Sequence, residues 1–327
     1  MRRRLAVGAE SWPIRGTFRI SRGAKTAAEV VVVELAEGDA LGRGECVPYA
    51  RYGQSIASTV AAVEELRAAL EDGLGRAALQ QALPPGAARN AVDAALWDLE
   101  AKRAGRPAHE LAGLPPPVPL TTAYTLSLDT PAAMAVAAAA AAGRPLLKLK
   151  LGGADDVERV RAVRAAAPAA RLMADANEAW TPAMVEMFGP ELHALGVELV
   201  EQPLPAAEDE ALRGLAAAVP LCADESCHDS RTLERLVGLY AFVNVKLDKT
   251  GGLTEALRTI ERATSLGLGC MVGCMLATSL GMAPALLAAQ RARYVDLDGP
   301  LLLARDRVPG LRYTGSVVAP PPRELWG

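Results

Sequence analysis

The chain has 327 residues, of which 51% are apolar, 22% are charged and 4% are aromatic. This composition supplies a large core and excludes a disordered chain, and the length predicts one large domain or two unequal ones. The formal net charge of −3, without a basic stripe, argues against nucleic acid and membranes as partners. The sequence leaves a homo-oligomer open.

The cysteines and the start of the chain bear on its location. None of the five cysteines forms a Cys-x-x-Cys pair, so we expect reduced thiols rather than a disulfide framework or a zinc ribbon. The basic start, residues 1–4, is not followed by the apolar segment of a secretory signal. We therefore expect a cytoplasmic protein.

The N-terminal third of the chain has a mixed α+β pattern. The β-branched run Val30–Leu35 predicts a strand, and Gly38–Gly44 predicts a turn region. Two helical patterns follow, over Ser58–Glu71 and Asn90–Ala104. The proline-rich stretch Leu114–Pro117 then marks a domain boundary.

Beyond this boundary, short strands alternate with helical stretches such as Pro131–Ala142 and Leu253–Leu266. The expected strands are Thr121–Thr125, Leu146–Leu151, Arg171–Ala174, Val197–Glu201, Leu221–Asp224, Phe242–Leu247, Cys270–Met275 and Tyr294–Leu297. Eight such units in about 180 residues predict a parallel (β/α) barrel rather than an open sheet.

Charged and polar side chains stand at the ends of these strands. They are Lys148 and Lys150, Asp175 and Asn177, Glu201, Asp224, Lys246 and Asp248, and Asp296 and Asp298. The steps from Lys150 to the next four strand ends are 25, 26, 23 and 22 residues, about one β/α unit each. Within a pair, the i, i+2 spacing keeps both side chains on one face of a strand. The sequence therefore predicts a charged ring at the carboxyl end of the barrel, where this fold places its active site.

Three acids of this ring, Asp175, Glu201 and Asp224, follow successive strands. Unpaired carboxylates would repel one another there, and a hard divalent cation would relieve the repulsion. Oxygen ligands without His or Cys favour Mg²⁺ over zinc. The alternative is three separate salt-bridged or solvated acids, which the one-unit spacing disfavours.

The lysines lie on both sides of these acids in strand order. Strands two and six of a closed barrel face each other across the mouth, which places Lys148 and Lys150 opposite Lys246. Two opposed lysines suit a reaction in which a proton leaves one face of the substrate and returns on the other.

The same residues carry a resemblance to a known family. The motifs are Lys148-Leu149-Lys150, Asp175-Ala176-Asn177, Glu201-Gln202-Pro203, Asp224-Glu225-Ser226 and Lys246-x-x-Lys249-x-Gly251-Gly252. In this order and spacing they resemble the muconate-lactonizing subgroup of the enolase superfamily. The helix Asn90–Leu99 is similar to that family's marker at the junction of cap and barrel.

The resemblance implies a fold and a set of roles. The fold would be an α/β chain: a (β/α)7β TIM-type barrel over residues 116–300, with an α+β capping domain over 1–115 and a C-terminal segment, 301–327, that returns to the cap. One Mg²⁺ per subunit would be bound by Asp175, Glu201 and Asp224, and Lys150 and Lys246 would transfer the proton. Further positions that would line the substrate are Lys148, Thr125 and Cys274; for Thr125 and Cys274 a purely structural role is an equally good interpretation.

Within the subgroup, Asp296-Leu297-Asp298 and the early segment Phe18–Gly23 resemble dipeptide epimerases. The implied activity is inversion of the α-carbon of the C-terminal residue of a dipeptide, most of all L-Ala-D/L-Glu, through a metal-stabilised enolate. The implied pathway is recycling of peptidoglycan peptides.

Charge supports a dipeptide substrate. Asp296 and Asp298 share one strand face without a basic residue at i±2, so the predicted partner is a cation of the ligand, such as a free α-ammonium. Arg22, in a glycine-flanked loop of the expected cap, is predicted to bind a second carboxylate such as a glutamate side chain.

Two other functions stay open. A cycloisomerase or an o-succinylbenzoate synthase of the same superfamily would keep the lysines and the acids, but it has no need of two aspartates at strand eight. A catalytically silent barrel that serves as a binding module would be expected to have lost at least one of these residues.

Overall fold

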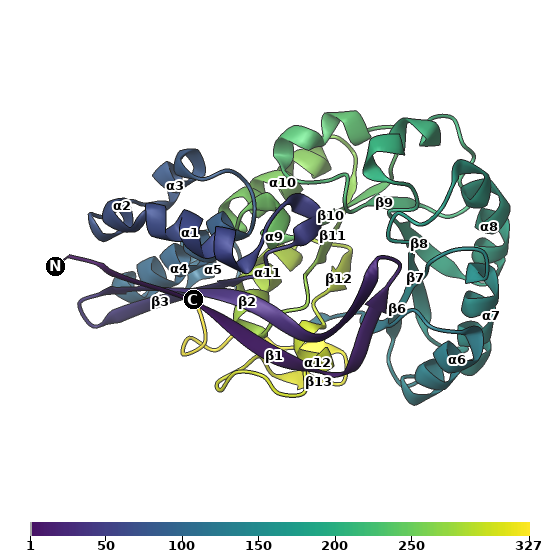
Figure 1. The fold of residues 1–327 in the computed structure, drawn as a ribbon, viewed down its shortest axis with the longest axis horizontal. Helices are drawn as coiled ribbons and strands as arrows, with labels where there is room; N and C mark the ends of the chain where they lie inside the picture. The colour runs from purple at the N-terminus through teal and green to yellow at the C-terminus, as the bar shows by residue number, and fades with distance from the viewer. Residues whose placement is uncertain (1) are drawn as a thin grey trace.

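The computed structural model describes residues 2–327, so Met1 of the basic start lies outside the described residues. The chain forms an α+β cap, on the left of Figure 1, and a barrel on the right. Among the described residues, no helix is long and apolar enough to cross a membrane. The five cysteines are all free thiols.

The cap is built on an antiparallel sheet of β1 (Arg4–Ile20), β2 (Gly23–Glu37) and β3 (Ala40–Cys46). The long β1–β2 hairpin reaches out from the cap across the barrel (Figure 1). The sheet is covered by α1 (Ile56–Glu65), α2 (Arg67–Glu71), α3 (Arg76–Ala82) and α4 (Ala87–Ala104), and the single turn η1 (Ala50–Tyr52) precedes them. The short helix α5 (Ala108–Leu111) packs against α4.

Two predictions for the cap were wrong in detail. The helix expected over Ser58–Glu71 is two helices, because the chain bends at Leu66. The region Gly38–Gly44 is mostly strand β3, with the turn confined to its start. Its glycines are needed for close packing: a Cβ on Gly42 or Gly44 would collide with the main chain of α4.

The barrel is a parallel sheet of eight strands in sequential order. The strands are β5 (Tyr124–Leu126), β6 (Leu146–Lys150), β7 (Arg171–Asp175), β8 (Val197–Glu201), β9 (Leu221–Ala223), β10 (Phe242–Val245), β11 (Gly269–Gly273) and β12 (Tyr294–Asp296). The amide of Ala123, just before β5, donates to Val295 O of β12 at 2.8 Å and closes the ring. The predicted fold class, a (β/α) barrel with an α+β cap, is confirmed.

Helices surround most of the barrel, and some crossovers are shorter. The outer helices are α6 (Pro131–Ala140), α7 (Asp156–Ala166), α8 (Pro182–Ala194), α10 (Leu253–Ser265) and α11 (Ser279–Ala289). Their starts are explicit in the sequence: Thr130 and Thr181 cap α6 and α8, each followed by a proline. After β8 and β9 the chain forms only the 3-10 helices η2 (Ala206–Leu212), η3 (Ser230–Thr232) and η4 (Glu234–Leu236). Short helices α9 (Leu247–Thr250) and α12 (Gly299–Leu302) follow the sixth and eighth strands.

The barrel interior has an apolar floor beneath its charged mouth. One buried side chain from each strand region forms this floor: Ala123, Leu146, Met173, Leu199, Cys222, Phe242, Met271 and Tyr294. Two residues further along, the strands carry Thr125, Lys148, Asp175, Glu201, Asp224, Asn244 and Asp296. Because side chains alternate along a strand, the polar layer lies directly above the floor.

The C-terminal segment joins both parts of the molecule. Strands β13 (Tyr313–Thr314) and β14 (Val317–Val318) form a small sheet with β4 (Leu120–Thr121) under the barrel. The last residues then pack on α4, where Trp326 Nε1 donates to Ala94 O at 3.0 Å.

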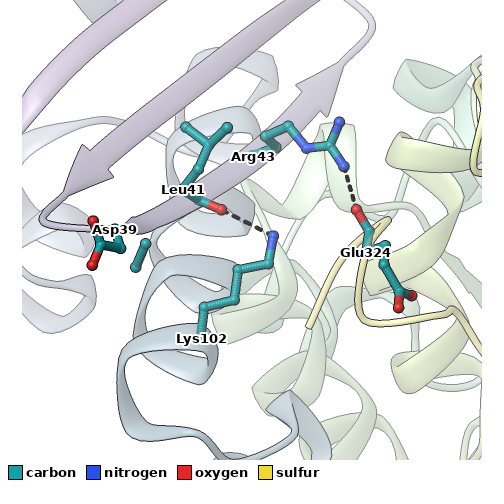
Figure 2. Close-up of a pocket in the computed structure, with 6 residues that line it drawn as sticks. Asp39, Leu41, Arg43, Lys102 and Glu324 are labelled. Carbon is teal, nitrogen blue, oxygen red and sulfur yellow. Dashed lines mark hydrogen bonds between the residues drawn. The ribbon is translucent and has the colours of Figure 1, made fainter.

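A surface pocket of about 560 Å³ marks this junction (Figure 2). In it Arg43 donates to Glu324 O at 2.7 Å, and Lys102 Nζ donates to Leu41 O at 2.9 Å. Arg43 thus joins the tail to β3, and Lys102 joins β3 to α4.

Candidate active site

The predicted charged ring lies at the carboxyl end of the barrel, beneath the cap hairpin. A pocket of about 400 Å³ is lined by Phe18 and Arg22 of the cap and by Lys150, Asp224 and Lys246 of the barrel. An adjoining recess of about 40 Å³ reaches down to the end of β12. The pocket is therefore shared between the two parts of the chain.

The three predicted metal-binding acids lie side by side and are almost wholly buried. Asp175 ends β7, Glu201 ends β8, and these two residues are paired in the sheet. Asp224 follows the last residue of β9. Three buried carboxylates on adjacent strands repel one another, and burial together with the charge of Asp175 raises the pKa of Glu201.

Lysines compensate this negative charge. Lys148 Nζ lies 2.7 Å from Glu201 Oε2, 2.8 Å from Asp296 Oδ2 and 3.2 Å from Asp175 Oδ2. Burial alone would lower the pKa of Lys148, but these carboxylates hold it well above its usual range. Lys148 is therefore charged and fixed at the centre of the barrel mouth.

The two lysines predicted to move protons stand opposite each other. Lys150 Nζ lies 2.6 Å from Asp175 Oδ2, and Lys246 Nζ lies 2.7 Å from Asp224 Oδ2. Their positions, at the end of β6 and just after β10, are four strands apart in a ring of eight. Both line the same pocket, and Lys150 also lies near the ring of Phe18, 6.0 Å from its centroid.

Two further residues hold the acids in place, and the sequence analysis assigned no role to either. Lys249 is fully buried, with its Nζ 2.5 Å from Asp224 Oδ1, and it also donates to Asp224 O. Asn244 Nδ2 donates to Glu201 Oε1 at 2.7 Å. Asn244 stands two residues before Lys246 on the same face of β10, so strand alternation alone was a usable signal for it.

The prediction for Asp248 was wrong. It assumed that the sixth strand continues through Leu247, but β10 ends at Val245 and Asp248 lies in helix α9. Its carboxylate accepts from Val47 N at 3.0 Å and from Asn90 Nδ2 at 2.8 Å, and both donors belong to the cap. Asp248 therefore joins the cap to the barrel instead of facing the mouth.

The recess holds the two aspartates of the eighth strand. Thr125 N donates to Asp298 Oδ2 at 2.6 Å, and no ion pair to Asp298 occurs among residues 2–327. Asp296 does have an internal cation, Lys148, which reaches it from β6, so the expectation that only a ligand would supply one was wrong for this residue. Its second oxygen, Oδ1, is buried without a hydrogen-bond partner.

Thr125 and Cys274 also line the recess. The Thr125 amide orients Asp298, so part of its contribution comes from the main chain. Burial, with the nearby charges of Asp296 and Asp298, raises the pKa of the Cys274 thiol well above its usual range. A thiol in this state is not a nucleophile.

Arg22 lies at the tip of the β1–β2 hairpin and is engaged by the barrel rim. Its Nη2 lies 2.5 Å from Glu225 Oε1, and its Nη1 donates to Asn177 O at 2.8 Å and to Glu178 Oε2 at 3.1 Å. Asn177 and Glu178 both have positive φ angles, 46° and 64°, a conformation that non-glycine residues adopt rarely. A ligand carboxylate at Arg22 would compete with Glu225.

The donor set at the mouth fits a hard cation. Across residues 2–327, no group of three His, Cys, Asp or Glu side chains has converged into a metal-binding arrangement, and lysines contact the carboxylate oxygens of Asp175 and Asp224. The donors of Asp175, Glu201 and Asp224 are nevertheless all oxygen, buried and adjacent. Such a set suits Mg²⁺ and other oxygen-seeking cations rather than zinc or copper.

Comparison with known proteins assigns the chain to a family. Residues 2–113 match the model of the mandelate racemase/muconate lactonizing enzyme N-terminal domain, and residues 132–323 match the enolase C-terminal domain-like model. The L-Ala-D/L-Glu epimerase of Escherichia coli K12 is 46% identical over 95% of this chain and 98% of its own length. An N-acetyl-D-glutamate racemase of a Pseudoalteromonas species is 44% identical over 91% of this chain and 95% of its own.

Solved structures give the same assignment. An enolase family member from Agrobacterium tumefaciens, described as homologous to dipeptide epimerases and bound to sodium and L-Ala-L-Glu, is 53% identical. It has a TM-score of 0.98 and covers 99% of this chain and 100% of that one. The dipeptide epimerase of Enterococcus faecalis, complexed with Mg and L-Leu-L-Tyr, is 29% identical with a TM-score of 0.90 over 98% of both chains. This chain therefore belongs to the mandelate racemase/muconate lactonizing enzyme family, within the enolase superfamily.

Proposed function

We propose that this chain is an isomerase that epimerises dipeptides, with L-Ala-D/L-Glu as its substrate. One observation carries the proposal: Lys150 and Lys246 line one pocket from opposite strands, with buried carboxylates between them. A substrate α-carbon between these lysines can lose a proton on one face and gain one on the other. The comparisons support the same reaction, since related proteins are named epimerases and racemases.

Asp175, Glu201 and Asp224 would hold one Mg²⁺. When bound, the cation supplies Lewis-acid stabilisation of the negative charge that develops on the substrate carboxylate after the α-proton is lost. Lys148, paired with Glu201 and Asp296, keeps the surrounding charge balanced. Related structures with a dipeptide also contain Mg or sodium, which supports a bound cation in this family.

The two lysines divide the work by face. Each is a base when it takes the α-proton on its own side and an acid when it returns one. Lys150 is oriented by Asp175, and Lys246 by Asp224. Net inversion requires that one lysine acts as the base and the other as the acid in each turnover.

The remaining residues set the substrate's orientation. Asp296 and Asp298 would bind the free α-ammonium of the dipeptide, because Asp296 Oδ1 lacks a partner and Asp298 lacks a cation. Arg22 would bind the glutamate side chain above the pocket. The free thiols support a cytoplasmic location. The proposed dipeptide substrate supports a role in the recycling of peptidoglycan peptides.

Proton NMR in D₂O tests the proposal. The protein, incubated with Mg²⁺ and L-Ala-L-Glu, should exchange the α-proton of the glutamate for deuterium and produce L-Ala-D-Glu. Exchange confined to the C-terminal residue would support a reaction beside the free carboxylate. Neither exchange nor epimer, from folded protein with Mg²⁺ present, would contradict the proposal.

A second candidate is racemisation of an N-acylated amino acid, which the N-acetyl-D-glutamate racemase relative favours. Such a substrate has no ammonium to place against Asp296 and Asp298. We therefore expect kcat/KM for L-Ala-L-Glu to exceed that for N-acetyl-L-Glu by at least about tenfold, as for the loss of one charge-assisted hydrogen bond. The opposite order would replace the dipeptide by the N-acyl substrate.

A further inference from the structure

Gln202 follows directly after Glu201, yet it does not line the pocket. Its side chain is wholly buried, and its φ of 34° is rare for a residue with a side chain. A strained backbone at a buried polar residue persists only when its surroundings hold it there. The contacts of Gln202 therefore need an explanation.

The side-chain amide of Gln202 is used on both of its ends. Oε1 accepts from Asp224 N at 2.9 Å and from Ser226 N at 3.1 Å. Nε2 lies 2.9 Å from both Leu204 O and Ser226 Oγ and 3.0 Å from Tyr240 OH, so its two hydrogens are shared among three acceptors. Both ends are satisfied inside the protein, so the amide has no capacity left for a ligand.

The contacts of the Gln202 side chain replace a main-chain hydrogen bond that is missing between β8 and β9. The ladder between β8 and β9 ends with Glu201 opposite Cys222, and Gln202 N still donates to Cys222 O at 2.8 Å. In a regular parallel ladder, the next bond would join Asp224 N to Gln202 O. The backbone of Gln202 is instead turned so that its carbonyl accepts from Glu178 N at 2.9 Å. The side chain of Gln202 takes over the bond to Asp224 N.

We propose that Gln202 is a positioning residue that sets the Asp224 carboxylate relative to Glu201 for cation binding; this rests on the metal site of the proposed function. The residue is covalently joined to Glu201 and hydrogen-bonded to the main chain of Asp224, so it couples two of the three acids. Its carbonyl bond to Glu178 extends the coupling to the loop that follows Asp175.

The proposed role of Gln202 predicts how much the metal affinity changes when this residue is replaced. Groups that orient metal ligands typically change metal affinity by 10- to 100-fold when they are removed. Gln202→Met keeps the length and volume of the side chain but leaves Asp224 N and Ser226 N without their acceptor. We expect this variant to bind Mn²⁺, used as a probe for the Mg²⁺ site, at least about tenfold more weakly than the wild type.

The experiment is Mn²⁺ titration by calorimetry on the full chain, beside thermal unfolding of each variant. If Gln202→Met does not fold, Gln202→Asn replaces it. Asparagine tolerates a positive φ, but its shorter side chain cannot bond to Asp224 N and to the acceptors of Nε2 at the same time. Tyr240→Phe is the matched control. It removes a partner from the far end of the amide, and it should keep wild-type affinity even at a comparable loss of thermal stability.

The outcomes separate this inference from the proposed function. Wild-type protein that binds no Mn²⁺ or Mg²⁺ would overturn the metal site itself. Wild-type binding with unchanged affinity in the folded Gln202 variant would overturn only the role of Gln202. An equal loss in Tyr240→Phe would also overturn it, since the amide would then matter only for the stability of the loop.

Discussion

Every acid that we propose for cation binding already contacts at least one lysine. Asp224 contacts two, with Lys246 on Oδ2 and Lys249 on Oδ1. Lys246 lines the pocket, whereas Lys249 is buried behind it. Lys246 can therefore leave Asp224 for the substrate while Lys249 keeps the carboxylate in place. This difference supports the proposed catalytic role for Lys246 and a structural role for Lys249, although both contact Asp224.

The lysines give the first prediction. Lys150→Ala and Lys246→Ala should each reduce net epimerisation of L-Ala-L-Glu by at least about 10²-fold, because each removes the acid or base on one face. Each variant should still exchange the α-proton of one stereoisomer with D₂O through the lysine that is left. Proton NMR with both epimers as substrates measures this.

Lys102→Ala, at the pocket of Figure 2, is the control: it lies outside the active site, and the folded variant should keep the wild-type rate of epimerisation. If either active-site lysine variant epimerised at the wild-type rate, the opposed arrangement would not be the catalytic one.

The proposed metal ligands give the second prediction. Glu201→Gln should lower turnover by at least about 10²-fold and weaken Mg²⁺ binding, because it removes a charged oxygen from the proposed ligand set. Glu198→Gln makes the same change on the same strand, but this side chain lies near the start of β8, where it contacts Arg171 and Tyr294 OH, and the change should leave turnover and Mg²⁺ binding as in the wild type. Chelation of the wild type should abolish activity, and added Mg²⁺ should restore it. Full activity in metal-free protein would refute the site.

Among the elements, the β1–β2 hairpin and the segment around η1 bring cap residues over the barrel. Its tip is held by Ser21, which donates to Asn177 O at 2.9 Å, and by Arg22, which contacts Glu225 and Glu178. Arg51, from the cap's η1 turn, also contacts Glu178. The two arginines at the rim are thus paired with the two glutamates, Glu178 and Glu225. An acidic substrate must therefore compete with these carboxylates for Arg22.

The hairpin gives the third prediction. Arg22→Ala should narrow the ratio of kcat/KM between L-Ala-L-Glu and L-Ala-L-Leu by several-fold, because only the glutamate side chain would use this cation. Arg51→Ala removes the other cation on Glu178 and should leave the ratio nearly unchanged. Steady-state kinetics with both dipeptides decides between them. An unchanged ratio in Arg22→Ala would exclude Arg22 from substrate selection.

The elements also show what the sequence can and cannot predict. Strand positions were predicted well, because a closed barrel imposes apolar runs at regular spacing, and the run Val197–Glu201 matched β8 residue for residue. The sequence prediction failed where one residue pattern is compatible with two different structures. Gly42 and Gly44 indicate a turn as readily as a strand packed closely beneath a helix. Pattern alone does not separate the two.

The same limit applies to the candidate site. The carboxylates and lysines were found because unit spacing brings strand ends together. Asp248 was misplaced because i, i+2 spacing holds only while the strand continues, and β10 had already ended. Gln202 and Lys249 received no role, because their contacts depend on a positive φ and on a turn of helix, which periodicity does not encode.

At the scale of the whole molecule, the pocket exists only while the cap is docked on the barrel. Buried polar contacts hold the two together: Asp248 binds Val47 and Asn90, and Arg89 donates to Thr250 O at 2.6 Å. Arg307, in the tail, contacts Glu45 of β3 at 2.6 Å. Apart from Val47, none of these residues lines the pocket, so the contacts affect substrate binding mainly through the position of the cap.

The tail gives the last prediction. Trp326 is 1% exposed and packs on α4, with its Nε1 bonded to Ala94 O. Trp326→Ala should lower the free energy of unfolding by about 3–5 kcal/mol, because it leaves a large cavity in a junction that the tail fills. Trp326→Phe keeps most of the ring but loses the N–H, and should cost about 1 kcal/mol. Urea unfolding measures both.

The kinetic effect of Trp326→Ala follows from the division of the site residues between cap and barrel. The proposed lysines and acids all belong to the barrel, whereas Arg22 belongs to the cap. A loosened cap should therefore raise KM for L-Ala-L-Glu in Trp326→Ala by more than it lowers kcat, at a temperature where the variant is still folded. Trp326→Phe should show wild-type values. A loss confined to kcat would mean that the tail supports the barrel mouth itself, and that the cap is held on the barrel by its other contacts alone.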